Sequence, residues 1–255
     1  MKRRVVVTGM GGLSPIGNTV DEMWANAKNG FCGIEEIKDP RFADLPVYVA
    51  GEVKNFDPTE HMSKMQARRT SRFVQLALVG AGEAIAQSGL DISQENPLRC
   101  GANVSSGIGG LPNIESEHYK GIEKGFDRIS PLFVPMSIAN MASGLIAIEY
   151  GLKGSCTCIV TACASATNAI GEAFRQIRDG YQDVMITGGS ESVMSDLGFG
   201  GFTTMRALSE SKNPERASIP FDKERDGFVM GEGSGILWVT PRRGGSTPRS
   251  SSACW

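Results

Sequence analysis

The chain alternates between two hydrophobic periods. Short runs of β-branched and apolar residues predict buried strands, and longer stretches with apolar positions three and four apart predict helices. The predicted strands span residues 5–8, 100–105, 158–162, 183–187 and 235–239. The predicted helices span residues 19 to about 30, 62–69, 70–87, 137–150 and 164–177. Strands that alternate with helices in this way predict an α/β fold with several strand–helix units.

Local signals predict where three of these helices begin or end. Thr19 and Glu22 have capping-box spacing, which predicts a helix that begins after Thr19. Gly89 and Gly180 are predicted to end the helices 70–87 and 164–177. The helix 70–87 is apolar on more than one side, so we expect it to be sandwiched between other elements.

Composition and charge exclude several classes of protein. The chain has 255 residues, enough for one large domain or two small ones. Its 26 Lys and Arg against 28 Asp and Glu lack the basic excess of a nucleic-acid-binding protein. Its apolar runs fall far short of the ~20 residues that a membrane span needs, and no stretch near the start has secretory-signal length. We therefore expect a cytoplasmic protein with reduced cysteines and neither a nucleic-acid nor a membrane partner.

The last residues differ in composition from the rest of the chain. From Thr240 onward the sequence is rich in Arg, Ser, Gly and Pro and has no apolar periodicity. This pattern predicts one domain over 1–239 and an aberrant, disordered tail over 240–255. Because the change follows the predicted strand 235–239 abruptly, a shifted reading frame is our hypothesis, which resequencing the gene would test.

Two motifs suggest cofactors that their spacing does not support. The run 9–12 begins like a dinucleotide fingerprint, but Ser14 stands where the third glycine belongs, which favours a tight strand-to-loop turn. Cys156, Cys158 and Cys163 lack the second pair of ligands that structural zinc needs. The first two would share one face of a strand, so we interpret them as small packed hydrophobes. The sequence predicts no metal and no cofactor.

Cys163 stands at a position that could activate a thiol. The predicted strand 158–162 ends there, and the predicted helix 164–177 begins with small residues. Unpaired backbone N–H groups and the helix dipole at such a position favour a thiolate, which is the nucleophilic form. From these residues alone, a buried and inert cysteine is the favoured interpretation.

The sequence around Cys163 resembles that of a known family. The segment 160–171 reads VTACASATNAIG, and further shared segments are 5–11, 105–110, 188–191, 202–209 and 220–233. Together they resemble the β-ketoacyl-acyl carrier protein synthases, with elongating bacterial members closest, over about residues 3–237. The resemblance implies a thiolase-like fold of layered mixed sheets and helices, built from two pseudo-symmetric halves and paired as a homodimer. This chain would hold largely the first half, as an N-terminal synthase domain.

The same resemblance implies a reaction. Cys163 would take an acyl group from acyl carrier protein and supply one oxyanion-hole donor from its backbone N–H. Malonyl-acyl carrier protein would then lose carbon dioxide and attack that thioester, a Claisen condensation of fatty-acid elongation that needs no cofactor. Family members use two histidines of the second half, whereas His61 and His118 here match neither motif, so both are predicted to be surface or capping residues.

The missing histidines lead us to expect a truncated chain that cannot complete condensation. The alternative is a non-catalytic partner subunit, similar to the chain-length factors, that pairs with a complete synthase. Cys163 argues against the alternative, because such subunits usually lack the nucleophile.

Two further sets of residues are assigned by the resemblance. Lys64, Arg68 and Arg69 would share one side of a helix and, with Arg206, form the docking site for the carrier protein; a solvated helix face is the alternative. Ile108 and Phe133 stand at positions of acyl-pocket walls, and either could instead belong to the ordinary core.

Overall fold

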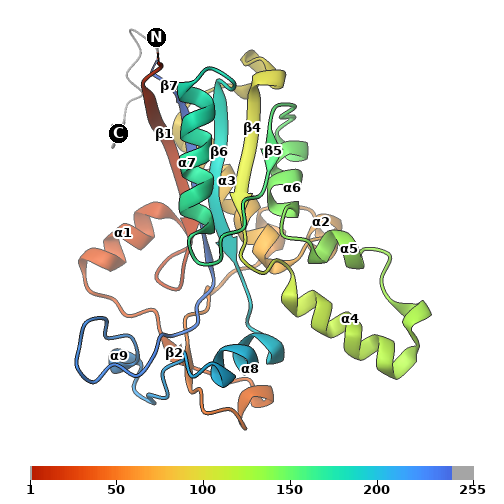
Figure 1. Cartoon of the computed structure of the whole chain (residues 1–255), viewed down its shortest axis with the longest axis vertical. Coiled ribbons are helices and arrows are strands. Elements are labelled where there is room, and N and C mark those ends of the chain that lie inside the picture. The colour runs from red at the N-terminus through yellow and green to blue at the C-terminus, as the bar shows by residue number, and fades with distance from the viewer. Residues whose placement is uncertain (1, 243–255) are drawn as a thin grey trace.

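A five-stranded mixed sheet forms the centre of the protein (Figure 1). The computed structural model describes residues 2–242. The strands of this sheet are β1 (Val5–Leu13), β4 (Cys100–Ser105), β5 (Cys156–Thr157), β6 (Val184–Glu191) and β7 (Gly233–Pro241). Their order is β1-β7-β6-β4-β5, in which β6, β4 and β5 are parallel and β7 is antiparallel to both neighbours. Two short strands, β2 (Glu35–Glu36) and β3 (Val49–Ala50), pair separately.

Helices cover the sheet and extend beyond its lower end in Figure 1. They are α1 (Val20–Lys28), α2 (Lys64–Arg69), α3 (Arg72–Ser88), α4 (Leu111–Lys124), α5 (Phe133–Ser137), α6 (Met141–Glu149), α7 (Ser165–Arg178), α8 (Asp196–Thr204) and α9 (Pro214–Ala217). Within residues 2–242, no helix has the length and apolar character needed to cross a bilayer.

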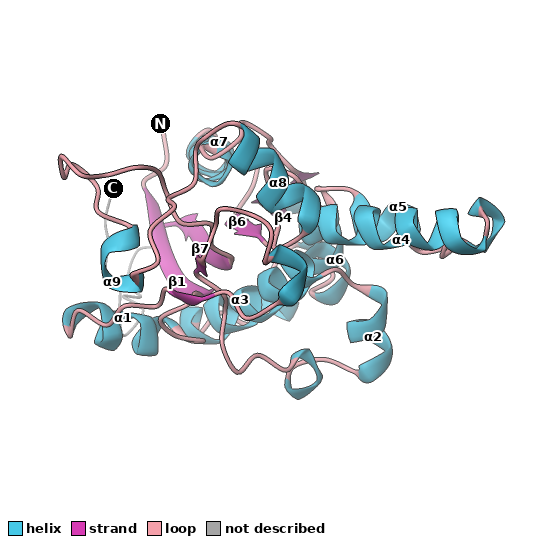
Figure 2. Ribbon diagram, turned by 90° about the horizontal axis from the view of Figure 1, so that it is seen from below, coloured by secondary structure: helices cyan, strands magenta, loops and turns pink. Residues whose placement is uncertain are grey.

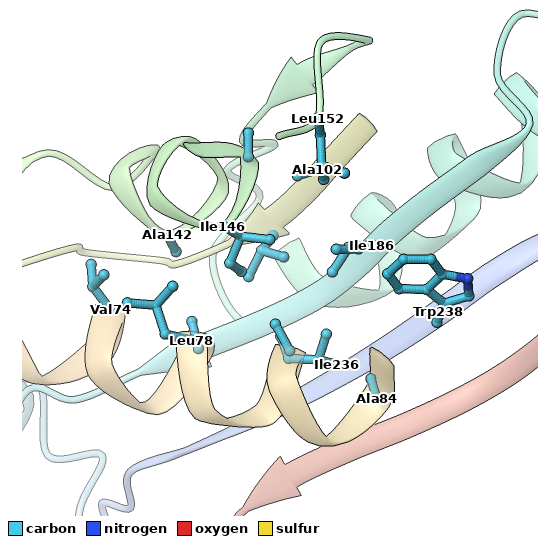
Figure 3. Close-up of a cluster of buried hydrophobic side chains, with 14 of the residues drawn as sticks. Val74, Leu78, Ala84, Ala102, Ala142, Ile146, Leu152, Ile186, Ile236 and Trp238 are labelled. Carbon is cyan, nitrogen blue, oxygen red and sulfur yellow. The ribbon is translucent and has the colours of Figure 1, made fainter. Parts of the chain in front are cut away.

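The helices α3 and α7 pack on opposite faces of the sheet, as Figure 2 shows. Side chains alternate along β6, so Val184 and Ile186 join the cluster around α3, while Met185 joins Ala173 and Ile177 of α7. The larger cluster lies between α3, α6 and the sheet (Figure 3). The predicted α/β organisation is thereby confirmed, with α3 buried against both the sheet and α6.

The glycine run of β1 corrects the predicted turn. The strand continues through these glycines to Leu13 instead of ending near Thr8. A Cβ atom on Gly9 would lie 1.9 Å from the Ala84 carbonyl oxygen, and one on Gly11 would lie 2.0 Å from that of Gly80. The glycines therefore let the backbone of α3 touch the backbone of β1, and they form no phosphate-binding turn between a strand and a helix.

The segment before Cys163 corrects a second prediction. No strand forms over 158–162; the pairing is confined to β5, where Cys156 and Thr157 lie beside Ala102 and Asn103 of β4. Cys156 is exposed and Cys158 is half-buried. The interpretation of both as packed hydrophobes is therefore wrong for Cys156.

Helix ends follow the local signals more closely. The Thr19 side chain caps α1 by accepting a hydrogen bond from the Glu22 N–H at 3.2 Å. Gly89 ends α3 in a left-handed conformation, with φ of 64°. The predicted helix 137–150 forms as α6 but begins later, at Met141, because Ile138 is extended after α5. β7 reaches Pro241, two residues beyond the predicted domain end at 239, and residues 243–255 of the predicted tail lie outside the described residues.

Candidate active site

A cavity of about 670 Å³ opens at the carboxyl ends of β4 and β6. The start of α7, the end of α8 and the first residues of β7 complete its walls. Its lining combines small residues with apolar ones, among them Ile108, Val193, Phe202, Met205, Phe228 and Met230. This size and lining suit a largely apolar small-molecule group.

Cys163 lies exposed in this cavity, two residues before α7 begins. The turn that presents it contains Ala162, whose φ of 51° is unusual for a residue with a side chain. The Ser165 hydroxyl closes the turn: it accepts from the Thr161 N–H at 2.8 Å and donates to the Ala162 carbonyl at 2.6 Å. The predicted position of Cys163, directly before a helix, is confirmed, and the interpretation as a buried cysteine is wrong.

The neighbouring thiols have different surroundings. Partial shielding from water raises the pKa of Cys156 and of Cys158. A hydrogen bond from the Ser106 N–H lowers the pKa of Cys158, but burial dominates. Both side chains are therefore held in the less reactive thiol form.

Glu191 is the cavity residue that the sequence patterns did not assign to a role. It ends β6, where its carboxylate accepts from the Ser106 hydroxyl at 2.8 Å and from the Gly107 N–H at 2.6 Å. Burial raises the pKa of this carboxyl group in spite of those hydrogen bonds. The signal available in the sequence was a single charged residue at the end of an apolar strand, which also fits an ordinary surface turn.

The two residues predicted to line an acyl pocket lie in different places, and both histidines lie away from the cavity. Ile108 lines the cavity and is 41% exposed, whereas Phe133, at the start of α5, is not among the lining residues. His61 is exposed and stacks on Phe56. His118 is exposed on α4, so both histidines are surface residues as predicted, and neither lines the cavity.

The predicted docking residues form two groups. Lys64, Arg68 and Arg69 are exposed on α2, which confirms that one short helix presents them. Arg206 is exposed directly after Met205, a residue of the cavity wall. α2 and α8 lie apart in both Figure 1 and Figure 2, so Arg206, which follows α8, is separate from the group on α2.

Comparisons with known proteins agree with this fold. Residues 2–243 match the family described as Beta-ketoacyl synthase, N-terminal domain, and the chain belongs to this family. It is 48% identical over 237 residues to 3-oxoacyl-[acyl-carrier-protein] synthase 2 of Staphylococcus aureus (strain COL), which covers 93% of this chain and 57% of that protein. The protein of the same name from Synechocystis sp. (strain ATCC 27184 / PCC 6803 / Kazusa) is 46% identical, over 92% of this chain and 57% of its own length. The chain thus spans somewhat over half the length of these curated relatives.

Solved structures establish the fold as thiolase-like. A ketosynthase described as bound to a hexaketide, in complex with its type II polyketide acyl-carrier protein, superposes with a TM-score of 0.84 and 31% identity. It covers 94% of this chain and 59% of its own. A beta-ketoacyl synthase from Burkholderia phymatum STM815 gives a TM-score of 0.82 with 27% identity, with the same coverage of 94% and 59%.

Proposed function

We propose that this chain is the acyl-accepting part of a 3-oxoacyl-acyl carrier protein synthase of the elongating type, synthase II. The observation that carries the proposal is Cys163, exposed at an apolar cavity and placed directly before α7. The 48% identity to 3-oxoacyl-[acyl-carrier-protein] synthase 2 supports the same reaction class. The cysteines of the described residues form no disulfide, which fits action in a reducing compartment such as the cytoplasm.

The first step transfers an acyl group to Cys163. Its thiolate attacks the carbonyl carbon of an acyl thioester, the new carbon–sulfur bond forms as the old one breaks, and the departing carrier thiolate takes up a proton. The N–H groups at the start of α7 favour negative charge beside them, and the Cys163 N–H would donate to the developing oxyanion.

The second step is decarboxylative condensation. A malonyl thioester loses carbon dioxide, its carbanion attacks the Cys163 thioester, and the cysteine leaves as a thiolate from a product two carbons longer. Carbanion formation needs groups that reach the malonyl thioester, and neither His61 nor His118 lies at the cavity. We therefore assign acylation to the described residues and expect no β-ketoacyl product from them alone.

The partners follow from exposed surfaces. Lys64, Arg68 and Arg69 would attract an acidic carrier protein, with Arg206 guiding its acyl arm at the cavity mouth. A second copy of the chain would cover β5, which forms one edge of the sheet. The exposed side chains of Val134, Ile138 and Val160 support that apolar contact.

Ile108 and Phe133, the two predicted pocket residues, would contact the acyl chain from different places. Ile108 already lines the cavity, where it would contact the acyl chain. Phe133 immediately precedes the exposed Val134. We propose that it reaches an acyl pocket only across the interface between two copies.

Acyl transfer to the protein tests the proposed function. The chain is incubated with an octanoyl-carrier protein thioester and analysed by mass spectrometry, with Cys163→Ser as the control. We expect one octanoyl group on Cys163, none on the variant, and no condensation product after malonyl-carrier protein is added. An unmodified protein that binds a complete ketosynthase tightly would support the non-catalytic partner subunit instead.

A further inference from the structure

A chain of hydrogen bonds connects Glu191 to the loop that carries Ile108. Glu191 accepts from the Gly107 N–H at 2.6 Å and from the Ser106 hydroxyl at 2.8 Å. The Ser106 hydroxyl in turn accepts from the Gly109 N–H at 2.8 Å. The two glycine N–H groups on either side of Ile108 are therefore held, directly or through Ser106, by one carboxylate.

The other side of this loop is fixed to α5. The Gly110 N–H donates to the Ser137 carbonyl at 2.9 Å. A Cβ atom on Gly110 would lie 1.9 Å from the Met136 carbonyl oxygen, so the loop backbone touches the backbone of α5. The loop of residues 106–110 is held on one side by α5 and on the other by Glu191.

Glu191 is the part of this arrangement that can respond to a small chemical change. The hydrogen bond to α5 joins two backbone groups, whereas the hydrogen bonds from Ser106 and Gly107 to β6 are both accepted by the Glu191 side chain. The Glu191 carboxylate lies partly buried, and hydrogen bonds to charged groups are stronger than those between neutral ones. Ile108 itself is 41% exposed, so its side-chain packing alone does not hold it.

We propose that Glu191 is a positioning residue that determines specificity: by holding the loop 106–110, its carboxylate fixes Ile108 as a wall against which an acyl chain packs. The inference rests on the proposed function, because it takes the cavity beside Cys163 as the acyl site. Glu191 acts through Ile108 and need not touch the reacting thiol. Its loss should change how the protein ranks chains of different length more than it changes the chemistry at Cys163.

Alkylation of Cys163 with N-alkylmaleimides tests this ranking. Rates at Cys163 are followed by peptide mass spectrometry for N-methylmaleimide and for reagents with longer alkyl chains, and the ratio of long-chain to methyl rate is the readout. In the unchanged protein we expect this ratio to rise with alkyl length. Glu191→Gln removes the charge and leaves one acceptor oxygen, so the side chain can no longer accept from both Gly107 and Ser106. We expect the ratio to fall by about tenfold, the effect of one lost hydrogen bond to a charged group.

Further variants separate positioning from folding. Glu191→Asp keeps both acceptor oxygens and should restore part of the ratio, and Ser106→Ala removes the link to Gly109 and should lower it. Glu123→Gln makes the same chemical change at an exposed position on α4 and should leave the ratio unchanged. If Glu191→Gln fails to fold, the rate ratio of Ser106→Ala tests the inference instead.

Two results would overturn the inference. If the Glu191 and Ser106 variants melt cooperatively and keep the ratio of the unchanged protein, Glu191 does not position Ile108, while the proposed function stands. If the unchanged protein shows no dependence on alkyl length, the cavity is not an acyl site, and the proposed function fails together with the inference.

Discussion

The two helices on opposite faces of the sheet have different tasks. α3 lies against the sheet through backbone contacts at the glycines of β1, and nine of its residues, from Phe73 to Ser88, are buried. α7 buries only Ser165, Ala169, Ala173 and Ile177, while the residues just before it are exposed at the cavity. One face of the sheet is therefore closed by tight packing, and the other presents a cysteine to an open site.

This difference shows how one fold combines a tightly packed face with an accessible thiol. Backbone contact between α3 and β1 leaves no room for a side chain to move. The turn before α7 is held by specific hydrogen bonds of Ser165, which fix a backbone conformation without covering Cys163. The two regions should therefore respond to different kinds of mutation.

The largest effect is expected where α3 touches β1. In Gly11→Ala the new Cβ atom would lie 2.0 Å from the Gly80 carbonyl oxygen, so helix and strand must separate. We expect the free energy of unfolding to fall by about 3 kcal/mol in urea denaturation. Gly171→Ala in α7 is the matched control: nothing lies within 4 Å of its added Cβ atom, and helix propensity should stabilise it by about 0.5–1 kcal/mol. Equal stabilities of the two variants would show that the face with α3 is no more tightly packed than the face with α7.

A smaller effect is expected at the turn before α7. Ser165→Ala removes the buried hydroxyl that bonds Thr161 and Ala162, which should lower the free energy of unfolding by about 1.5 kcal/mol. It should also slow alkylation of Cys163, because the turn no longer holds the thiol toward the cavity. Ser116→Ala, at an exposed position of α4, should change neither quantity. An unchanged alkylation rate in Ser165→Ala would mean that the turn does not present Cys163.

A mutation beside the end of β6 that lies far from the cavity should change stability but not the reactivity of Cys163. The Arg99 guanidinium, assisted by Arg3, holds the pKa of Asp183 down at about 2 against partial burial. A lowered carboxyl pKa stabilises the folded state above the unfolded pKa, and this contribution disappears as the pH falls through the folded value. After allowance for solvent screening, Asp183→Asn should therefore cost about 1 kcal/mol at pH 7 and nothing below pH 2, with Cys163 alkylation unchanged. A stability cost that persisted below pH 2 would contradict this origin.

The smallest effect is expected from a charge change on α2, the short helix just before α3. Arg68 lies exposed on α2, directly before α3, and does not line the cavity. Arg68→Glu should weaken binding of an acidic carrier protein about threefold at low salt and flatten its salt dependence, because surface charges are screened within ~8–10 Å. Lys28→Glu, exposed on α1, is the control of equal charge change. Equal affinities for the Arg68 and Lys28 variants at low salt, measured by titration, would remove α2 from the docking surface.

Local sequence signals predicted much of this architecture. The strand at 100–105, the cap at Thr19 and the end of α3 at Gly89 depend on neighbours in sequence, and all three are confirmed. The run 9–12 was misinterpreted because its glycines serve a contact with residues about 70 positions later, which no local pattern reveals. The prediction of a strand at 158–162 was wrong for a similar reason: pairing depends on a distant strand, and in this part of the chain only Cys156 and Thr157 pair with β4.

In the candidate site, too, one residue could be predicted from local sequence and another could not. Cys163 was found because a thiol before a helix has a local signature and because the surrounding segment resembles a known family. Glu191 has no spacing partner in the sequence: Ser106 and Gly107 lie 85 and 84 positions away and meet it only because β4 and β6 are neighbours. The role proposed for it could be inferred only from the assembled sheet.

Site-resolved alkylation tests the central claim, that the face with α7 presents a reactive cysteine while Cys156 and Cys158 are held in the less reactive thiol form. The protein is treated briefly with limiting iodoacetamide at neutral pH, and label on each cysteine is quantified by peptide mass spectrometry. We expect Cys163 to react at least about tenfold faster than Cys156 or Cys158, whose pKa values are raised by shielding from water. Label spread evenly over the cysteines would contradict the account, because it would show that the environment of the nucleophile is not assembled.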